Sequence, residues 1–596
     1  MAKRSMQFVF GATPTVSLRR SKFNLSHGLK TSMSIGTLYP LDVTEVLPGD
    51  TFRMNEKHVV RLSSAYLRPV MDNCFLDIYY FYVPSRILYD EWENVFGDPN
   101  PSAYITTERS EVPHVGLNGN DRLVVAPHSV ADYLGLPVGE HEYDPANAND
   151  TGISSLPFRG FAMIWNEWFR NENTDNPVNI QFGNMSQSLA FERLNDDPWS
   201  PSNYTGMLPK VGKKKDYFTS CLPKPQKGES VNLSLGTSAD LNGLQTAPDG
   251  TKFLPVNNLP YGTVTTNNIV RPKAYTILTA GSVSDASLGP LGITNINSGG
   301  HGISSFAGSN PSGSPYPVYL GLGTDMSNVN VDLSNATAAN VNDLRMAFAL
   351  QKMLEADARY GTRYREYILG HFGVSNADAR MQIPEFLGGK RTPLNVQQVP
   401  QTNSQSGQDI TSPLGALGAF SHSVGSSRFS KSFTEHGYVF CVGCIRQLHT
   451  YQQGVDRFWL RTVREDFYDP KFANIGEQPV YSAELDLGHV VNQGKLTDMI
   501  FGYNEAWADY RYKPSKITGE MRTGVENTLD IYHFGDYYQN VPTLTSDFIQ
   551  ETPQFFDRTV AVPSSSQDNF VLDFWFDFTA YRVMPVYSVP GLIDHH

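Results

Sequence analysis

Residues Met71–Gly97 read MDNCFLDIYYFYVPSRILYDEWENVFG, and the first half of this stretch alternates with a period of two. Alternation that is rich in aromatic residues predicts a β-strand over Cys74–Val83. Both faces of this strand are mostly apolar, which predicts a central strand covered on both sides. Pro84 cannot donate to a β-ladder and ends the strand. Ser85 then stands where it caps a helix that closes at Gly97.

The far end of the chain carries a second strong alternation, in the predicted strand Phe570–Val583. One of its faces is wholly apolar and consists of Phe570, Leu572, Phe574, Phe576 and Phe578. Five large side chains on one face need a partner sheet to cover them. Two such strands, nearly a whole chain apart, fit a β-sandwich whose terminal strands lie close together while the chain between them loops out.

Composition sets the class of protein. The chain has 596 residues, of which 40% are hydrophobic and 12% aromatic, enough for a large core. No apolar run reaches the length of a membrane span, and Phe8–Phe10 is too short for a signal peptide, so we expect no export. The cysteines, Cys74, Cys221, Cys441 and Cys444, are too few for a disulfide scaffold and fit a reducing cytoplasm.

The first 40 residues form a basic N-terminal arm. No Asp or Glu precedes Asp42, whereas this arm carries Lys3, Arg4, Arg19, Arg20, Lys22 and Lys30. The rest of the chain then holds 41 basic against 60 acidic residues, a balance of −19. A basic arm on an acidic body predicts contacts with nucleic acid through Arg19, Arg20 and Lys22. A disordered terminus with incidental charge is the alternative, and charge by itself leaves both open.

Residues 41–227 are predicted to be the first part of the core. Leu41–Gly49 and Thr51–Leu67 are expected to be strands on either side of a turn. Leu156–Asn173 has aromatic residues at helical spacing, which favours a packed core helix over a stacking platform for bases.

A second basic segment lies in Lys210–Gly228, where Lys213, Lys214 and Lys215 adjoin Tyr217. Basic residues interleaved with aromatic ones are what binding of single-stranded nucleic acid requires. A solvated charge run beside buried rings is the alternative, and we weigh it as the more frequent of the two.

Residues 228–340 differ in composition from the remainder. Only nine of these 113 residues are charged, and Gly, Ser, Asn, Thr and Pro dominate. This predicts a surface insertion. The second part of the core, 341–596, is expected to hold two helices and then a loop, followed by three strands. Their predicted ranges are Val341–Tyr360 and Tyr364–Phe372 for the helices, Lys390–Ser430 for the loop, and Gly437–Thr450, Gln478–Val491 and Phe570–Val583 for the strands.

No constellation of residues favours catalysis. Cys441 and Cys444 are the one pair with metal-like spacing, with His422, His436 and His449 nearby in sequence. In a strand, residues i and i+3 point to opposite faces, so joint ligation is disfavoured. The chain has no phosphate loop, no nucleophile elbow and no HExxH motif. We therefore predict neither an enzyme nor a cofactor or metal site.

Several motifs resemble one family along nearly the whole chain. In the first half these are Pro48-Gly-Asp-Thr-Phe52, Pro69-Val-Met-Asp-Asn73, Phe81-Tyr-Val-Pro84, Leu156-Pro-Phe-Arg159 and Asp216-Tyr-Phe-Thr219. In the second half they are Gly361-Thr-Arg-Tyr364, Leu387-Gly-Gly389, Ile475-Gly-Glu-Gln478 and Phe501-Gly-Tyr503. The chain resembles the major capsid proteins of microviruses, small single-stranded-DNA bacteriophages, and their gokushovirus branch in particular.

This resemblance implies a mainly β fold, an eight-stranded jelly-roll sandwich with long inter-strand insertions and a few short helices. It implies self-assembly into a T=1 icosahedral shell around circular single-stranded DNA, in a virion assembled in the bacterial cytoplasm. It also implies a host-attachment protrusion formed by 228–340. Further implied partners are a small basic DNA-binding protein, a pilot protein and a scaffolding protein. A receptor-binding spike and a β-rich glycan-binding protein or glycosidase remain the alternatives.

Overall fold

The chain divides into two compact units in a computed structural model of the protein. One unit is Met1–Gly228 with Leu354–His596, and the other is Glu229–Met353. The second unit has limits close to those of the predicted insertion 228–340, most of which lies outside the described residues. The structure describes residues 19–96, 110–116, 122–142, 152–184, 187–188, 198–229, 231, 245–246, 252–253, 275–279, 318–322, 341–400, 402, 417–490 and 495–587.

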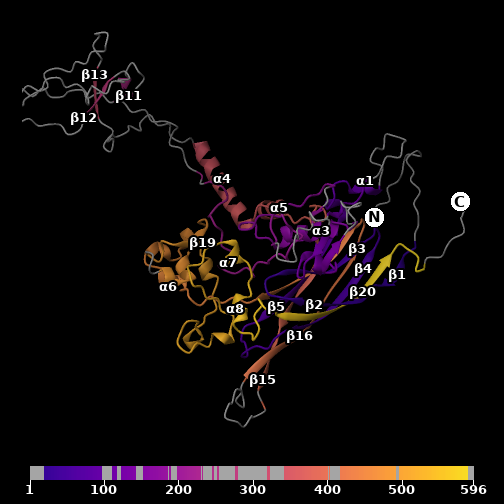
Figure 1. The fold of residues 1–596 in the computed structure, drawn as a ribbon. Helices are drawn as coiled ribbons and strands as arrows, with labels where there is room; N and C mark the ends of the chain where they lie inside the picture. Colours follow the sequence, from indigo (N-terminus) through magenta and orange to yellow (C-terminus); the bar gives the residue numbers. More distant parts are fainter. Residues whose placement is uncertain are drawn as a thin grey trace, which may run out of the picture. The chain divides into compact units, whose positions relative to one another are not determined.

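Two antiparallel sheets form the centre of the larger unit (Figure 1). The β20 sheet has the strand order β1-β20-β4-β16-β15, with β2 also paired to β20. The β5 sheet has the order β14-β5-β17-β3. The strands of the β20 sheet are β1 (Ser21–Asn24), β2 (His27–Met33), β4 (Thr51–Leu62), β15 (Val396–Pro400), β16 (Leu417–Ser432) and β20 (Phe570–Arg582). Those of the β5 sheet are β3 (Leu38–Val46), β5 (Cys74–Pro84), β14 (Glu385–Leu394) and β17 (Gly437–Gln447).

The order of these strands is that of an eight-stranded jelly roll. Strands β1 and β2 are two halves of a first strand, since both pair with β20, the last one. Working inward along the chain, β3 pairs with β17, β4 with β16, and β5 with β14. This nested pairing of first with last, second with seventh and so on is the jelly-roll connection. The predicted fold class is therefore confirmed.

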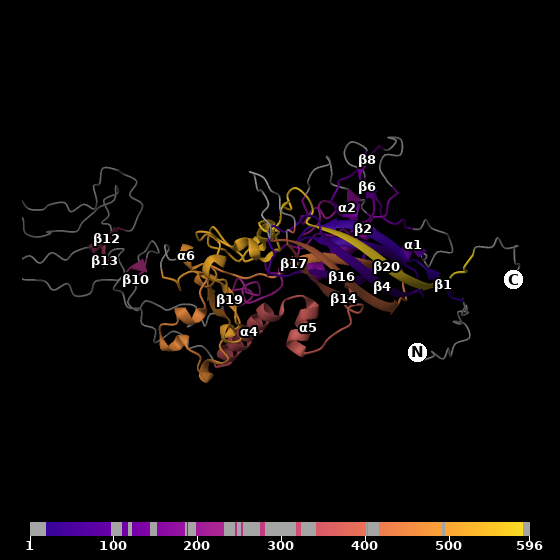
Figure 2. The same ribbon diagram turned by 90° about the horizontal axis from the view of Figure 1, so that it is seen from below.

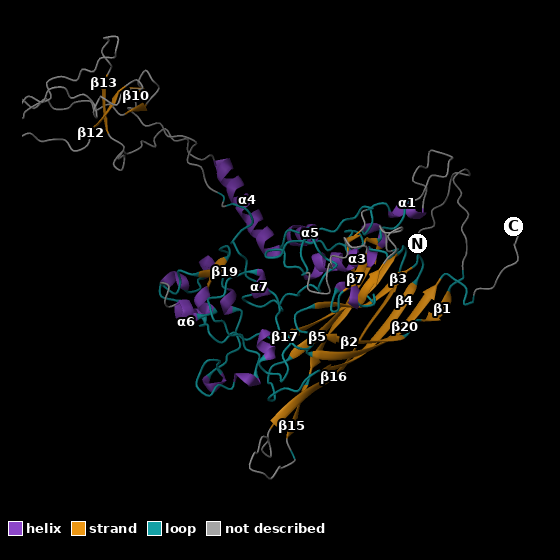
Figure 3. Cartoon of the chain, in the orientation of Figure 1, coloured by secondary structure: helices purple, strands orange, loops and turns teal. Residues whose placement is uncertain are grey.

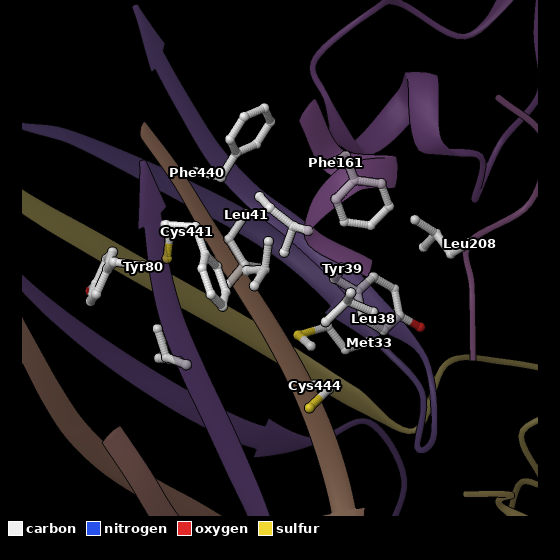
Figure 4. Close-up of a cluster of buried hydrophobic side chains, with 14 of the residues drawn as sticks. Met33, Leu38, Tyr39, Leu41, Tyr80, Phe161, Leu208, Phe440, Cys441 and Cys444 are labelled. Atoms are coloured by element: carbon white, nitrogen blue, oxygen red, sulfur yellow. The ribbon is translucent and has the colours of Figure 1, made fainter. Parts of the chain in front are cut away.

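The two sheets pack face to face around an aromatic core. Tyr80 of β5 lies 4.8 Å from Phe429 of β16, measured between ring centroids. All five residues of the predicted apolar face of β20 are at most 1% exposed. The β5 sheet is covered on its other side by helix α3 (Leu156–Ile164), where Gly160 lets Phe440 approach; a Cβ at Gly160 would lie 2.7 Å from that ring. Figure 4 shows Phe440 and Phe161 among these buried side chains.

The remaining elements lie outside the two sheets, where helices and turns predominate (Figure 3). The predicted helices over Val341–Tyr360 and Tyr364–Phe372 are confirmed as α4 and α5. Among the helices of the described residues, none has the length and apolar character that crossing a bilayer requires. The other α-helices of the described residues are α1 (Trp92–Phe96), α2 (Val130–Tyr133), α6 (Leu487–Val490), α7 (Ser546–Ile549) and α8 (Gln554–Asp557), and Trp165–Phe169 forms a π-turn after α3. The short strand pairs outside the sandwich are β6 (Val115–Gly116) with β9 (Gln187–Ser188), β7 (Arg122–Val125) with β8 (Gly139–Glu142), β10 (Gln245–Thr246) with β11 (Lys252–Phe253), β12 (Tyr275–Thr279) with β13 (Val318–Leu322), and β18 (Gln478–Tyr481) with β19 (Ile500–Asn504).

The predicted arm is not separate from the core. Residues 1–18 lie outside the described part, but β1 and β2 form hydrogen-bonded ladders with β20. The jelly roll therefore begins near Ser21 and not at residue 41. Apolar and polar residues alternate only weakly in the sequence of β2. The strand lies at the edge of the sheet and only its last residue, Met33, is fully buried, so few of its positions require an apolar side chain.

Three other predicted elements are wrong. The helix expected after β5 is a 3-10 turn, Ser85–Ile87, followed by a separate short helix, α1. The expected loop Lys390–Ser430 contains half of β14, most of β16 and all of β15, since pairing along β4 and β5 outweighs a composition rich in Ser and Gly. Within the part of 478–491 that the structure describes there is no sandwich strand, because β18 pairs with β19.

Candidate nucleic-acid interface

The β20 sheet has one buried face and one open face. Along β4, Phe52, Met54 and Val60 are buried, whereas Arg53, Lys57 and Arg61, at alternate positions of the strand, are exposed. Successive side chains of a strand point to opposite faces, so these three cations share the open face. Figure 2 shows β4, β20 and β16 side by side in this sheet.

Cations from four strands gather on the open face. Paired residues of antiparallel strands point to the same side, and the register places Lys22 beside Tyr581, Lys30 beside Asp573 and Arg428 beside Asn55. None of the six cations forms an ion pair with another residue that the structure describes. The carboxylates that these strands place on the same face are Asp573 and Asp577. We call this surface the basic face; it comprises Lys22, Lys30, Arg53, Lys57, Arg61, Arg428, Trp575 and Tyr581.

Two aromatic side chains lie among these cations. Trp575 is 52% exposed although it belongs to a sandwich strand, and it is paired with Lys57 on one side and with Gly28 on the other. A Cβ at Gly28 would lie 3.5 Å from the indole ring, so the ring rests against a backbone without a side chain. The guanidinium of Arg53 lies 5.5 Å above the centre of the Tyr581 ring. Binding of single-stranded nucleic acid requires cations that attract the phosphates and aromatic rings on which the bases stack. This surface provides both.

The arm residues predicted to contact DNA adjoin this face. Arg19 and Arg20 directly precede β1 and are exposed, and Lys22 lies on β1 itself. Arg20 donates a hydrogen bond from Nη1 to Oγ1 of Thr51, the first residue of β4, at 3.2 Å. The structure therefore brings these three residues to the edge of the basic face.

The second predicted basic segment is split by burial. Lys213 is buried and its Nζ lies 3.3 Å from Oδ2 of Asp536, which is fully buried. Tyr217 is also buried, donates to Oε2 of Glu484 at 3.1 Å and stacks on Tyr512. Both side chains are buried and paired, which disfavours direct contact with a nucleic acid in this conformation, so binding of DNA by Lys213 and Tyr217 stays a prediction. A buried ammonium must be paired, and a local sequence pattern cannot show its partner over three hundred residues away.

Lys214 and Lys215 remain exposed. They border a cavity of about 550 Å³ whose rim also carries Arg511 and Lys513. These two lysines stay candidates for nucleic-acid contacts away from the basic face.

Cys441 and Cys444 are both buried in β17, where burial raises the pKa of each thiol. Figure 4 shows Cys441 near Tyr80 and Cys444 farther along the strand. His449, one of the histidines considered with them, is instead bound by the carboxylates of Asp536 and Glu551. Within the described ranges no group of three or more His, Cys, Asp or Glu side chains is arranged to hold a metal ion.

Prediction from sequence missed Arg53, Lys57, Arg61, Arg428 and Trp575. A usable signal was present for three of them. Arg53, Lys57 and Arg61 are spaced four residues apart in a segment predicted as a strand, and even spacing places side chains on one face. For Arg428 the spacing of residues gave no such signal. Its segment was predicted to be a loop, and the side chains of a loop cannot be assigned to one face from their spacing.

Comparison with known proteins gives a consistent result along the whole chain. A family model described as "Capsid protein (F protein)" matches residues 11–592. Capsid protein VP1 of Chlamydia phage 1 is 36% identical, over 98% of this chain and 97% of the relative. Capsid protein VP1 of Bdellovibrio phage phiMH2K is 36% identical over 99% of both chains. Capsid protein VP1 of Spiroplasma virus 4 is 36% identical over 96% of this chain and 95% of the relative.

Proposed function

This chain belongs to the capsid protein (F protein) family of microviruses, and from this premise we propose that it forms a T=1 icosahedral shell whose basic face binds a circular single-stranded DNA genome. Its role is structural and not enzymatic, and it is a component of the virion. We place shell assembly in the cytoplasm of the bacterial host.

The observation that carries this proposal is that the basic face is positively charged although the chain as a whole is negatively charged. The chain as a whole has a net charge of −13. The basic face nevertheless places six cations against two carboxylates. A body this acidic repels DNA, so a surface that attracts it has to concentrate unpaired cations. Exposed Trp575 at the centre offers a ring on which a base of any sequence can stack.

Neutralising the basic face is expected to weaken the salt dependence of DNA binding. Six phosphate contacts give a slope of log affinity against log salt of about −4, at about −0.7 per contact for single strands. Replacing Arg53, Lys57 and Arg61 with Gln should therefore reduce this slope by about two units, equally for different DNA sequences. Fluorescence titration of the full chain with labelled single strands at several salt concentrations measures the slope.

The matched control replaces three exposed lysines on other elements, Lys224, Lys352 and Lys471, with Gln. It removes the same charge and should leave the slope nearly unchanged. Equal slopes for both triple variants would show that binding follows net charge and not the basic face. A parallel variant with Gln at Arg19, Arg20 and Lys22 tests the arm, and one with Gln at Lys214 and Lys215 tests the second site.

We also propose that residues 228–340 attach the virion to its host. The low charge of this region and its separation into a unit of its own support that assignment. Replacing Lys252–Asn310 with a short Gly/Ser linker should preserve folding and particle formation while reducing adsorption to host cells. Particle counts by electron microscopy and adsorption assays separate the two effects. An insoluble variant, or one that forms no particles, would place this region in the core or in a subunit contact.

A small basic DNA-binding protein, a pilot protein and a scaffolding protein complete the proposed set of partners. The acidic balance of the chain supports the first of these, because a basic companion would neutralise further genome phosphate.

A further inference from the structure

A second exposed cluster lies far from the basic face in sequence, on the turns that follow β17 and near β19. Its side chains are aromatic and unusually open to solvent: Trp459 is 70% exposed, Phe467 53% and Tyr510 52%. We call this cluster the aromatic patch; it consists of Phe458, Trp459, Phe467, Tyr468, Phe472 and Tyr510.

Most of the patch gathers around one arginine. The Arg461 guanidinium lies 4.2 Å above the ring of Tyr510 and 6.0 Å from that of Phe467. Tyr468 packs edge-on against Tyr510, with 6.1 Å between ring centroids. Phe458 and Trp459 contact each other at 4.9 Å and line the same cavity as Arg461 and Tyr510.

The backbone beneath these rings is firmly held. Buried Trp507 donates from Nε1 to the carbonyl of Phe472 at 2.8 Å. Asp466 accepts hydrogen bonds from the backbone N–H groups of Thr462 and Val463 at 2.8 and 2.9 Å. The exposed rings are therefore presented by an ordered surface, and a partner would bind them with little loss of conformational entropy.

The size and composition of the patch are those of a protein interface. A buried aromatic side chain covers about 150–250 Å², so six rings that are roughly half exposed offer about 600 Å² of apolar surface. That equals the upper end for an ordinary monomer and approaches the roughly 800 Å² per partner of a standard interface. Trp, Tyr and Arg are also the residues that dominate binding energy at such interfaces.

We propose that the aromatic patch is a contact surface for a second copy of this chain in the assembled shell, an inference that rests on the proposed function. Every shell subunit must bury surface against its neighbours, and the patch supplies nearly the area that one such contact needs. Nucleic acid fits less well, because the cation at the centre, Arg461, is already ion-paired with Asp509 and both side chains are largely buried.

The test compares self-association of the purified full chain with that of a double variant, Trp459→Ser with Phe467→Ser. Sedimentation velocity over a range of concentrations measures association, and negative-stain microscopy records whether shells form. The double variant should need at least about tenfold more protein for the same degree of association. Met71→Ser is the matched control, because Met71 is 72% exposed but lies outside the patch; it should associate as the wild type does. Circular dichroism melting curves that match the wild type establish that the double variant is folded.

The outcomes separate this inference from the proposed function. Closed shells from both the wild type and the double variant, at the same concentration, would overturn the inference and leave the proposed function standing. A wild type that stays monomeric even in the presence of the proposed scaffolding protein would contradict both. A double variant with unchanged self-association but weaker binding to labelled single-stranded DNA would assign the patch to nucleic acid and overturn its role between subunits.

Discussion

Replacing Phe574 with alanine is expected to lower the free energy of unfolding by about 3–5 kcal/mol, the cost of removing a fully buried phenylalanine. Phe574 is 0% exposed and lies at the centre of β20, paired with Leu29 of β2 and His58 of β4. Its ring stacks on Phe576, with centroids 6.0 Å apart. The cavity would open inside the sandwich, where strands on both sides prevent collapse. Equilibrium denaturation of the full chain measures the loss.

The adjacent residue provides the matched control. Trp575 lies on the same strand, but its side chain points to the open face and is 52% exposed. Trp575→Ala should therefore change the free energy of unfolding by less than about 1 kcal/mol while weakening the binding of single-stranded DNA. Similar losses of stability in both variants would contradict the assignment of one buried and one open face.

The second large effect is expected at Asp536, which holds together three distant segments. Its carboxylate accepts from Nδ1 of His449 at 2.8 Å and from the Tyr538 hydroxyl at 2.7 Å, and it pairs with Lys213. Removing one partner of a buried charge pair costs about 3–5 kcal/mol, since the remaining charge is left uncompensated. Asp536→Asn should lose stability on this scale, whereas Asp577→Asn, on the open face, should lose little.

The pH profile of unfolding distinguishes this network from simple packing. Burial alone would lower the pKa of His449, but the carboxylates of Asp536 and Glu551 outweigh it and raise this pKa to about 10. A raised pKa stabilises the fold fully below about pH 6.5, the value for an unfolded histidine, and this contribution is lost as the pH rises toward 10. Wild-type stability should therefore fall over that range. In Asp536→Asn the fall should begin at the same pH, near 6.5, but end at lower pH and be smaller, because one of the two carboxylates that raise the pKa of His449 is gone. Identical profiles would contradict the ion pair.

Prediction from sequence succeeded where one strand carries its own pattern. Alternation within each strand predicted the apolar face of β20 and the two largely apolar faces of β5. The apolar face of β20 is buried, and so are most residues of β5. It failed for β16, whose inward positions include Ser421, Ser423 and Ser427. Small residues are needed there because β4 places His58 beneath the strand; a Cβ at Gly425 would lie 2.2 Å from its Nε2 atom. That requirement arises from a partner strand far away in sequence, so composition alone indicated a loop.

The candidate site shows the same limit. Arg19, Arg20 and Lys22 were predicted from a run of charge, and the structure places them beside the basic face. Lys213 and Tyr217 match the same kind of pattern, yet ion pairing and burial remove them from the surface. The basic face itself depends on the register between β4, β20 and β16, which no local pattern specifies.

Cryo-electron microscopy of the purified particles tests the central claim most directly, because it shows the shell, the orientation of each subunit and the genome together. We expect a closed icosahedral shell in which the basic face is turned toward the interior, with density for nucleic acid against Trp575 and the cations of β4. Particles in which the basic face lies on the outer surface, or open oligomers without nucleic acid, would contradict it.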